Sequence, residues 1–280
     1  MGDPLDLTLL PAAVSPLVAA EVAGPSRRRR VLAAFPTCLY VELGAHERVL
    51  AVLASDAVAL PNGLRLAVPS AQLHWGVEPG AHVVVGDGRV RLPRADVVAA
   101  RLQRPSRVTP TRRIPVTPPG LPDAGVLGEL AHDIAAAALT GRPVEPGVRG
   151  LVGAGRGLTP SGDDALCGVL LVLAAVDAPH ARRAHATLSA AVRTSLPWTT
   201  SLSAALLVAA ASGYAVPDVV RLVSRLVTGD ASDGVSAELV DRVLAIGHTS
   251  GRDLLSGVTG ALRAVDVSLE STPQEGARRG

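Results

Sequence analysis

The hydrophobic pattern of this chain changes its period near residue 100, and that change limits the folds it can adopt. Between Val31 and Leu92, short β-favouring segments are separated by turn sequences such as Asn62-Gly63 and Gly86-Asp87-Gly88. Beyond Asp123, apolar residues recur at helical spacing. The sequence therefore predicts an α+β fold, with a small N-terminal antiparallel β barrel or sandwich followed by an Ala-rich, mainly α-helical C-terminal domain.

Changes in composition give the expected domain boundaries. We expect an N-terminal segment over residues 1–30, a β-rich domain over 31–103, a Pro-rich linker over 104–122, a helical domain over 123–267 and a disordered tail over 268–280. The expected strands are 38–43, 48–53, 64–68, 82–85 and 89–92, and Arg94 to Arg101 is predicted as a short helix. The other expected helices are 125–139, 161–176, 181–194, 200–212, 217–227, 236–246 and 250–265.

Composition excludes several classes of function. All 27 basic residues are Arg, so no lysine is present to form a Schiff base with PLP or to hold phosphate in a P-loop. The formal net charge of +2 is too small to indicate a nucleic-acid partner, and Arg27 to Arg30 are interpreted as a solvated segment ahead of the first strand. The histidines show no zinc-ligand spacing, and nothing in the sequence indicates a nucleotide or haem site.

The cysteines and the apolar runs indicate the compartment. Cys38 and Cys167 form neither a disulfide framework nor a CxxC pair, which favours a cytoplasmic location and buried packing roles for both. The longest apolar run, 165–176, is well short of the ~20 residues that span a bilayer. The apolar stretch 5–23 is followed rather than preceded by its positive cluster, unlike a signal peptide. We therefore expect no membrane partner.

A glycine-rich motif before one predicted helix returns in reduced form before another. Both copies read Ser-Gly-x-Asp-x-Leu-x-Gly, from Ser161 to Gly168 and, eighty-nine residues later, from Ser250 to Gly257. The pattern places a hydroxyl residue at each expected N-cap and an Asp three positions later, as in a capping box. It is consistent either with an old duplication or with two uses of one helix-start design. We expect the two helix starts to face one site on the same side of the domain.

The physical case for such a site rests on the unpaired N–H groups and partial positive charge of a helix N-terminus, which favour anions. Glycine after each serine leaves the backbone open to a ligand. In the purely structural alternative, Ser161 and Ser250 only cap helices, the Asp residues complement the dipole and the glycines allow close packing. The surplus of glycines, with Arg156 and a doubled carboxylate, within 153–164 favours a functional interpretation.

These residues resemble a known family. The segment Gly155 to Asp164 with Gly168, the later Gly247 to Gly257, and Pro61-Asn62-Gly63-Leu64 are similar to the pattern of a family of bacterial proteins that includes a subunit of the oxamate carbamoyltransferase of anaerobic allantoin degradation. The resemblance extends roughly from Val31 to Ala264. It implies transfer of a carbamoyl group between oxalurate or oxamate and phosphate or carbamoyl phosphate, in nitrogen metabolism, together with other, unrelated subunits.

Carbamoyl transfer needs donors for an anion and for a polarised carbonyl group, and acceptors for the carbamoyl NH2 group. We expect His248 to act as an acid–base or electrophile, and Asp163 as the functional carboxylate, because Arg252 stands at its place in the second copy. Asp164 and Asp253 are expected to be structural. Substrate or anion binding is assigned to Gly155, Arg156, Gly157, Thr159, Ser161, Gly162, Thr249, Ser250 and Gly251.

Three classes of function remain open. The preferred hypothesis is a carbamoyltransferase or its subunit, which binds a small anion such as oxamate, oxalurate or carbamoyl phosphate between the two helix starts. The second is a non-catalytic anion-binding or assembly subunit, and in the corresponding structural alternative His248 only packs or caps its loop. The third is a metal-dependent hydrolase in which Asp163 and Asp164 hold the metal; Mg²⁺ is the cofactor that this pair suggests.

Overall fold

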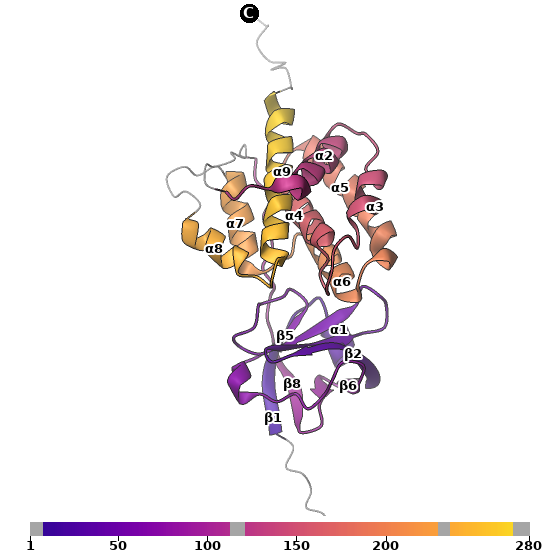
Figure 1. Ribbon diagram of the computed structural model, residues 1–280. Coiled ribbons are helices and arrows are strands. Elements are labelled where there is room, and N and C mark those ends of the chain that lie inside the picture. Colours follow the sequence, from indigo (N-terminus) through magenta and orange to yellow (C-terminus); the bar gives the residue numbers. More distant parts are fainter. Residues whose placement is uncertain (1–7, 113–120, 229–235, 271–280) are drawn as a thin grey trace, which may run out of the picture. The chain divides into compact units, whose positions relative to one another are not determined.

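The computed structural model describes residues 8–112, 121–228 and 236–270, which form two compact units. A barrel unit holds the residues up to Ser106 together with 201–209 and 215–217. A helical unit holds 107–200, 210–214 and the residues from Asp218 onward. The predicted α+β fold, with a β barrel first and helices second, is confirmed (Figure 1).

Eight strands form the closed barrel, in the order β1-β5-β4-β3-β2-β6-β7-β8. Their bounds are β1 (Thr8–Val14), β2 (Arg27–Phe35), β3 (Cys38–Glu42), β4 (Val49–Leu53), β5 (Gly63–Leu66), β6 (His82–Gly86), β7 (Arg89–Arg91) and β8 (Ala95–Leu102). The connections contain a short helix, α1 (Ala19–Ala23), and a 3-10 turn, η1 (Ser70–Gln72). Six of the pairings between these strands are antiparallel, whereas β1–β8 and β4–β5 are parallel.

The barrel core is aliphatic, as the scarcity of aromatic residues requires. Leu50 and Val52 of β4 belong to the main core of the barrel. Ala51 and Leu53 alternate with them and join a smaller cluster that includes Cys38. Every residue of β4 is therefore buried, which agrees with its unbroken apolar sequence.

Parts of the β half differ from the sequence prediction. Arg94 to Arg101, predicted as a short helix, lie almost entirely in strand β8, so that prediction was wrong. Pairing with β1 on one side and β7 on the other outweighs the helix propensity of the alanines in this segment. Arg27 to Arg30 lie within β2 and pair with β6, instead of preceding the first strand. Strand β1 was not predicted from the sequence, and it contains Pro11, which is unfavourable in a strand.

The helical unit is built from α2 (Gly125–Leu139), α3 (Glu145–Leu151), α4 (Ser161–Ala175), α5 (Pro179–Ser195), α7 (Pro217–Thr228), α8 (Ala237–Leu244) and α9 (Ser250–Glu270). A 3-10 turn, η2 (Leu196–Trp198), follows α5, and most of α6 (Ser201–Ala211) groups with the barrel unit. Helix α9 packs along α2 and α4, while α5 packs against α2, α3 and α4 (Figure 1). Because α4 lies among these helices, it is buried over nearly its whole length.

Only part of the expected linker and tail is described. Within the expected linker, the N–H groups of Val108 and Thr111 donate to the carbonyl groups of Gly213 and Ala175, at 2.9 and 2.8 Å. Residues 113–120 of the linker lie outside the described residues. The same holds for 271–280 of the expected tail, while 268–270 belong to α9.

Helices α4 and α9 cross at two glycines that occupy the same place in the repeated motif. A Cβ atom on Gly168 would lie 2.3 Å from the carbonyl oxygen of Leu254 in α9, and one on Gly257 would lie 2.0 Å from that of Ala165 in α4. Ala165 and Leu254 are themselves equivalent positions, so each copy makes the same contact with the other. Only glycine lets two helix backbones approach this closely.

Replacement of Gly168 or Gly257 by Ala is expected to destabilise the protein by about 1–3 kcal/mol, the usual range for overpacking a core. The new methyl group meets backbone carbonyl groups, which cannot move aside as a flexible side chain can. Gly150→Ala in α3 is the matched control, because a Cβ atom there meets nothing within 4 Å and should stabilise the helix slightly. Urea unfolding measures these variants, and equal stability of Gly168→Ala and Gly150→Ala would contradict the tight crossing.

Candidate functional site

The glycine-rich loop at 153–160 reaches α4 along a path that glycine adopts readily. Gly153 and Gly155 have φ angles of 75° and 129°. A Cβ atom on Gly153 would lie 2.4 Å from the carbonyl oxygen of Trp198, and one on Gly155 would lie 2.6 Å from the amide nitrogen of Ser161. The path of the loop therefore already accounts for these two glycines.

The start of α4 is closed by backbone groups. The carbonyl oxygen of Pro160 accepts hydrogen bonds from the N–H groups of Asp163 and Asp164, at 3.0 and 3.2 Å. Pro160 is the N-cap residue, and no side chain caps the helix. The prediction that Ser161 caps α4 in a capping box with Asp164 was therefore wrong, because the extended ψ of 142° at Pro160 already places its carbonyl group at the first turn.

The glycine that follows each serine of the motif packs against a preceding helix. A Cβ atom on Gly162 would lie 2.1 Å from the carbonyl oxygen of Leu151 in α3, and one on Gly251 would lie 1.9 Å from that of Val243 in α8. The N–H groups of both glycines donate to preceding carbonyl groups, at 2.9 and 3.0 Å. In both copies, glycine is needed because the backbone of the preceding helix occupies the place of a side chain. The N–H groups of Gly162 and Gly251 already have protein partners.

Asp163 is fully buried, and both of its carboxylate oxygens have protein partners. Oδ1 accepts a hydrogen bond from the N–H group of Gly153 at 3.0 Å, and Oδ2 accepts one from the hydroxyl group of Thr199. The hydroxyl group of Thr200 donates a hydrogen bond to the carbonyl group of Leu158, which lies in the same glycine-rich loop. Asp163 therefore holds the glycine-rich loop against the segment that precedes α6.

Asp164 has different surroundings. Only 6% of it is exposed, yet its Oδ2 atom has no hydrogen-bond partner within the described parts of the chain. Burial is the main reason that the pKa of Asp164 is raised to about 8. The charges of Asp253 and Asp163 act in the same direction, and the hydroxyl groups of Ser250 and Thr159 act against it.

The two copies of the motif meet at a pair of hydroxyl groups. Thr159 Oγ1 and Ser250 Oγ lie 2.8 Å apart and share a hydrogen bond. Asp253 follows Ser250 by about one turn on the same face of α9, and its Oδ2 atom is also buried without a partner among the described residues. The helical unit thus brings together Thr159, Asp164, Ser250 and Asp253, a set that we call the junction.

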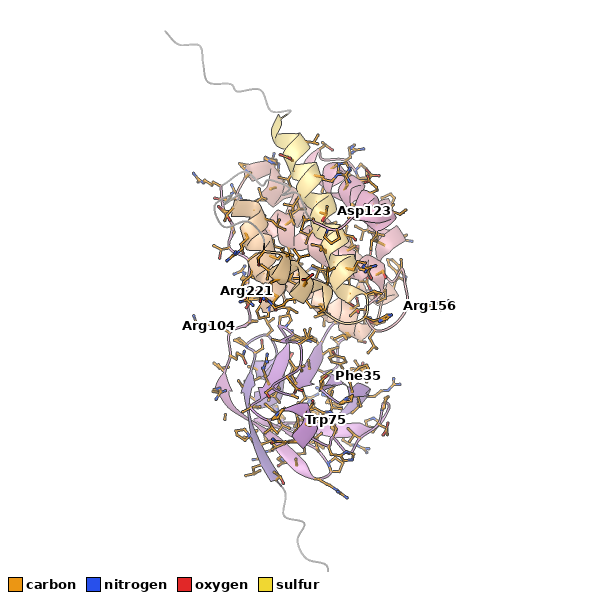
Figure 2. The ribbon with its side chains drawn as sticks, turned by 60° about the vertical axis from the view of Figure 1, so that its left-hand side comes forward. Phe35, Trp75, Arg104, Asp123, Arg156 and Arg221 are labelled. Carbon is orange, nitrogen blue, oxygen red and sulfur yellow. The ribbon has the colours of Figure 1, made fainter. Side chains whose placement is uncertain are left out.

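Exposed residues adjoin the junction in the sequence. Arg156 is exposed on the loop between Gly155 and Gly157, and Figure 2 shows it at the surface of the helical unit. His248 and Thr249, directly before α9, are exposed as well. A guanidinium group and an imidazole that are open to solvent can both bind a small anion.

Thr199 and Thr200 were not among the predicted site residues. Their signal in the sequence was weak: a run of hydroxyl residues, Thr199-Thr200-Ser201, that leads into α6 and has some resemblance to a polar position of the family that the motifs resemble. The residue before them, Trp198, is packed by the guanidinium group of Arg149, which lies 4.5 Å from the ring centroid. This segment positions the glycine-rich loop, and we assign it no direct chemical role.

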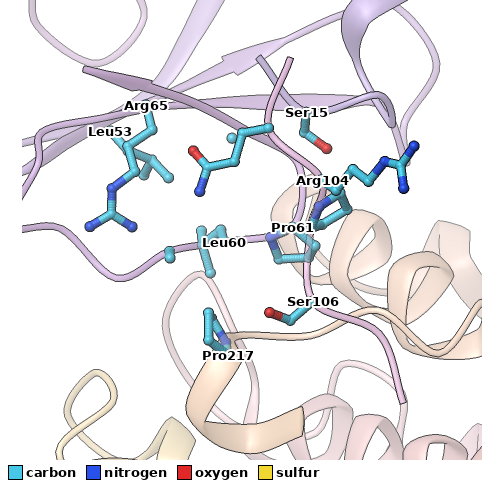
Figure 3. Close-up of a pocket in the computed structure, with 12 residues that line it drawn as sticks. Ser15, Leu53, Leu60, Pro61, Arg65, Arg104, Ser106 and Pro217 are labelled. Atoms are coloured by element: carbon cyan, nitrogen blue, oxygen red, sulfur yellow. The ribbon is translucent and has the colours of Figure 1, made fainter. Parts of the chain in front are cut away.

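Cavities among the described residues lie away from the junction. One of about 350 Å³ lies between α2 and α3 and has apolar lining residues such as Leu130 and Ile134. Another, of about 50 Å³, lies in the barrel unit and is lined by Pro61 and Gly63 among others (Figure 3). It is far smaller than the roughly 300 Å³ at which small-molecule pockets begin. In the Pro61-Asn62-Gly63 stretch, the side-chain amide of buried Asn62 donates to the carbonyl group of Val49 at 2.8 Å.

Within residues 8–112, 121–228 and 236–270, no group of three or more His, Cys, Asp or Glu side chains is placed to hold a metal ion. Cys38 and Cys167 are free thiols and both are buried, which confirms their predicted packing roles. Burial raises the pKa of the Cys167 thiol well above its usual value. No helix in the described residues is long and apolar enough to cross a membrane.

Asp163→Asn is expected to lower the free energy of unfolding by about 1–3 kcal/mol, because the amide NH2 group cannot accept the hydrogen bonds that reach the carboxylate. Asp241→Asn in α8 removes the same charge at an exposed position and should change stability little. Chemical denaturation followed by circular dichroism compares the two variants. An Asp163→Asn protein as stable as Asp241→Asn would show that this carboxylate does not anchor the loop.

The raised pKa of Asp164 predicts a pH dependence of stability. The folded state keeps the proton of Asp164 up to about pH 8, whereas in the unfolded chain this carboxyl group has its ordinary pKa of 3.8 and loses the proton near that pH. Between these values the folded state binds more protons, so stability falls as pH rises, with a slope of about 1.4 kcal/mol per pH unit from this group. Asp164→Asn should remove that slope. Identical slopes in both proteins, measured by denaturation between pH 5 and pH 8, would contradict the assignment.

One known protein family is similar to a large part of the helical unit. No solved structure gives a significant match to this chain. A family model, described as oxamate carbamoyltransferase subunit AllH, matches residues 151–262, from the end of α3 into α9. These residues include both copies of the motif and all four members of the junction. The resemblance carried by the two Ser-Gly motifs is thereby confirmed: residues 151–262 of this chain match the family of oxamate carbamoyltransferase subunit AllH.

Proposed function

We propose that this chain is a subunit of an oxamate carbamoyltransferase and that its helical unit binds the small substrate beside the junction. One observation carries the proposal: the family match spans both motifs, and the structure joins them through Thr159 and Ser250. The reaction would convert oxalurate and phosphate into oxamate and carbamoyl phosphate, and the reverse. Both directions move a carbamoyl group between a nitrogen and a phosphate oxygen.

The residues near the junction supply the types of group that this reaction needs. Arg156 is exposed and can bind the phosphate or carboxylate group through two parallel hydrogen bonds. The hydroxyl groups of Thr159 and Ser250 can donate to a carbonyl oxygen. Exposed His248 can move a proton to or from the nitrogen of the leaving group. The N–H groups at the start of α4 contribute less than expected from the sequence, because Pro160 and the loop already engage them.

The contacts of the adjacent carboxylates favour a reversal of the roles expected from the sequence. Both oxygens of Asp163 accept hydrogen bonds from the protein, so this residue is assigned to positioning the loop. Asp164 retains an oxygen without a partner in the described residues and belongs to the junction. Asp164 is therefore the better candidate for the functional carboxylate, and Asp163 no longer serves the hydrolase hypothesis as a metal ligand.

A test of this function needs the assembly and not the isolated chain, since the matched family is described as a subunit. The chain would be affinity-tagged in its own host, purified with whatever subunits accompany it, and assayed for carbamoyl phosphate formed from oxalurate and phosphate. Thr159→Val and Ser250→Ala should each reduce the turnover number at least about tenfold, equivalent to about 1.4 kcal/mol of transition-state stabilisation. Thr187→Val, at an exposed position of α5, is the matched control.

The outcomes separate the remaining hypotheses. An assembly that keeps full activity after this chain is removed would refute the proposal. Activity that requires the chain but is unchanged in both junction variants would support the alternative, a non-catalytic anion-binding or assembly subunit.

Binding of the anion can be tested on the purified chain. Phosphate, carbamoyl phosphate or oxamate is expected to stabilise the folded state by about 2.7 kcal/mol at a hundredfold excess over its dissociation constant. Arg156→Ala should abolish the shift in melting temperature, whereas Arg183→Ala, which removes an exposed guanidinium group from α5, should retain it. A shift that persists in Arg156→Ala would place the anion elsewhere.

A further inference from the structure

We propose that the junction is a binding site for one divalent cation, Mg²⁺ or Mn²⁺, held between Asp164 of α4 and Asp253 of α9. This pair joins one carboxylate from each copy of the motif, and it differs from the adjacent Asp163 and Asp164 that the sequence suggested. The proposal does not depend on the carbamoyl-transfer reaction.

One carboxylate oxygen of each member of this pair is buried and has no hydrogen-bond partner among the described residues. The Oδ2 atoms of Asp164 and Asp253 are both buried, and neither has a hydrogen-bond partner within residues 8–112, 121–228 and 236–270. Asp164 is more than nine-tenths buried. A buried carboxylate oxygen without a donor is unfavourable, and a bound cation is one of the few groups that compensates two of them at once.

The crossing of α4 and α9 places the two carboxylates on either side of the same contact. Asp164 precedes Ala165, whose carbonyl oxygen packs against Gly257, and Asp253 precedes Leu254, whose carbonyl oxygen packs against Gly168. The two carboxylates therefore flank the same crossing, at equivalent positions of the two helices. The crossing is rigid because backbone meets backbone, so the spacing of the carboxylates is fixed by the fold.

The groups that neighbour the two carboxylates are also oxygen donors. The hydroxyl oxygens of Thr159 and Ser250, which share a hydrogen bond, are uncharged oxygen donors beside the two carboxylates, and oxygen is the ligand that Mg²⁺ prefers. Magnesium usually takes one or two carboxylates from the protein and completes its shell with water or substrate phosphate. Two carboxylates and two hydroxyl groups match that donor set, and a shell of three or more acidic residues is not required.

Asp163 is excluded from the ligand set by its own contacts. Its Oδ1 and Oδ2 atoms accept from the Gly153 N–H group and from the Thr199 hydroxyl group. It therefore holds the loop that carries Thr159 while Asp164 faces the junction. This division explains why two adjacent carboxylates occur in the first copy of the motif.

The experiment measures binding of Mn²⁺ to the purified full chain after treatment with a chelator. Electron paramagnetic resonance of free Mn²⁺ should show one bound ion per chain, displaced by Mg²⁺. Asp164→Asn and Asp253→Asn should each weaken the affinity at least about tenfold, since each removes one carboxylate ligand. Asp241→Asn, exposed on α8, is the matched control and should bind as the wild type does.

Each result decides the matter. Absence of binding to the wild-type chain at millimolar Mn²⁺ overturns the proposal even if both variants fail to fold, because the wild-type measurement stands alone. Unchanged affinity in the two folded variants overturns the location. Loss of binding in both variants, with native circular dichroism and with binding kept in Asp241→Asn, supports it. None of these outcomes involves oxamate or carbamoyl phosphate, so a failure here leaves the proposed function untouched.

Discussion

The close crossing of α4 and α9 at Gly168 and Gly257 is the contact on which the helical unit depends. Because the backbones touch there, no side chain separates the two helices at this point, and the first turn of α4 is largely buried. That is why Asp164 is buried although it lies only three residues from the start of α4. Burial of this carboxyl group is unfavourable, and the close crossing of the two helices keeps it buried.

The reciprocity of the crossing is consistent both with an old duplication and with two uses of one helix-start design. The segment α2, α3 and α4 has the order helix, short helix, loop and long helix, and the same order recurs in α7, α8 and α9. The two copies differ in the loop before the long helix. The first copy has a longer loop, which Asp163 anchors, and the second has a shorter one with the exposed Arg252 at the place of Asp163. The extra carboxylate is thus explained by the extra length of chain.

Much of the fold could be predicted from the sequence, because Ala-rich helical spacing and Val-rich strands with glycine turns are local signals. The turn Gly86-Asp87-Gly88 was predicted, and its three residues have positive φ angles in the hairpin between β6 and β7. Strand β8 could not be predicted, since its alanines favour a helix and only pairing with β1 and β7 makes it extended.

The site could be predicted only in part, for a related reason. Repetition of the motif led to the expectation that the two helix starts lie on the same side of the domain, and a hydrogen bond does join the loop before α4 to the start of α9, between Thr159 and Ser250. These two residues are not equivalent positions of the repeat. The partners of individual carboxylates could not be predicted, because they depend on contacts between distant segments. Asp163 meets Thr199, thirty-six residues away, and no local pattern links the two.

The closed barrel has a consequence for how this chain can associate with other proteins. Each of the described strands has a neighbour on both sides, so the barrel has no edge strand that a partner strand could extend along its full length. A partner that contacts the barrel would then meet side chains of its outer surface, such as the exposed aromatic ring of Phe35. Association through this unit would therefore depend on the shape and chemistry of its outer surface, which can change by substitution without disturbing the hydrogen bonds that close the barrel.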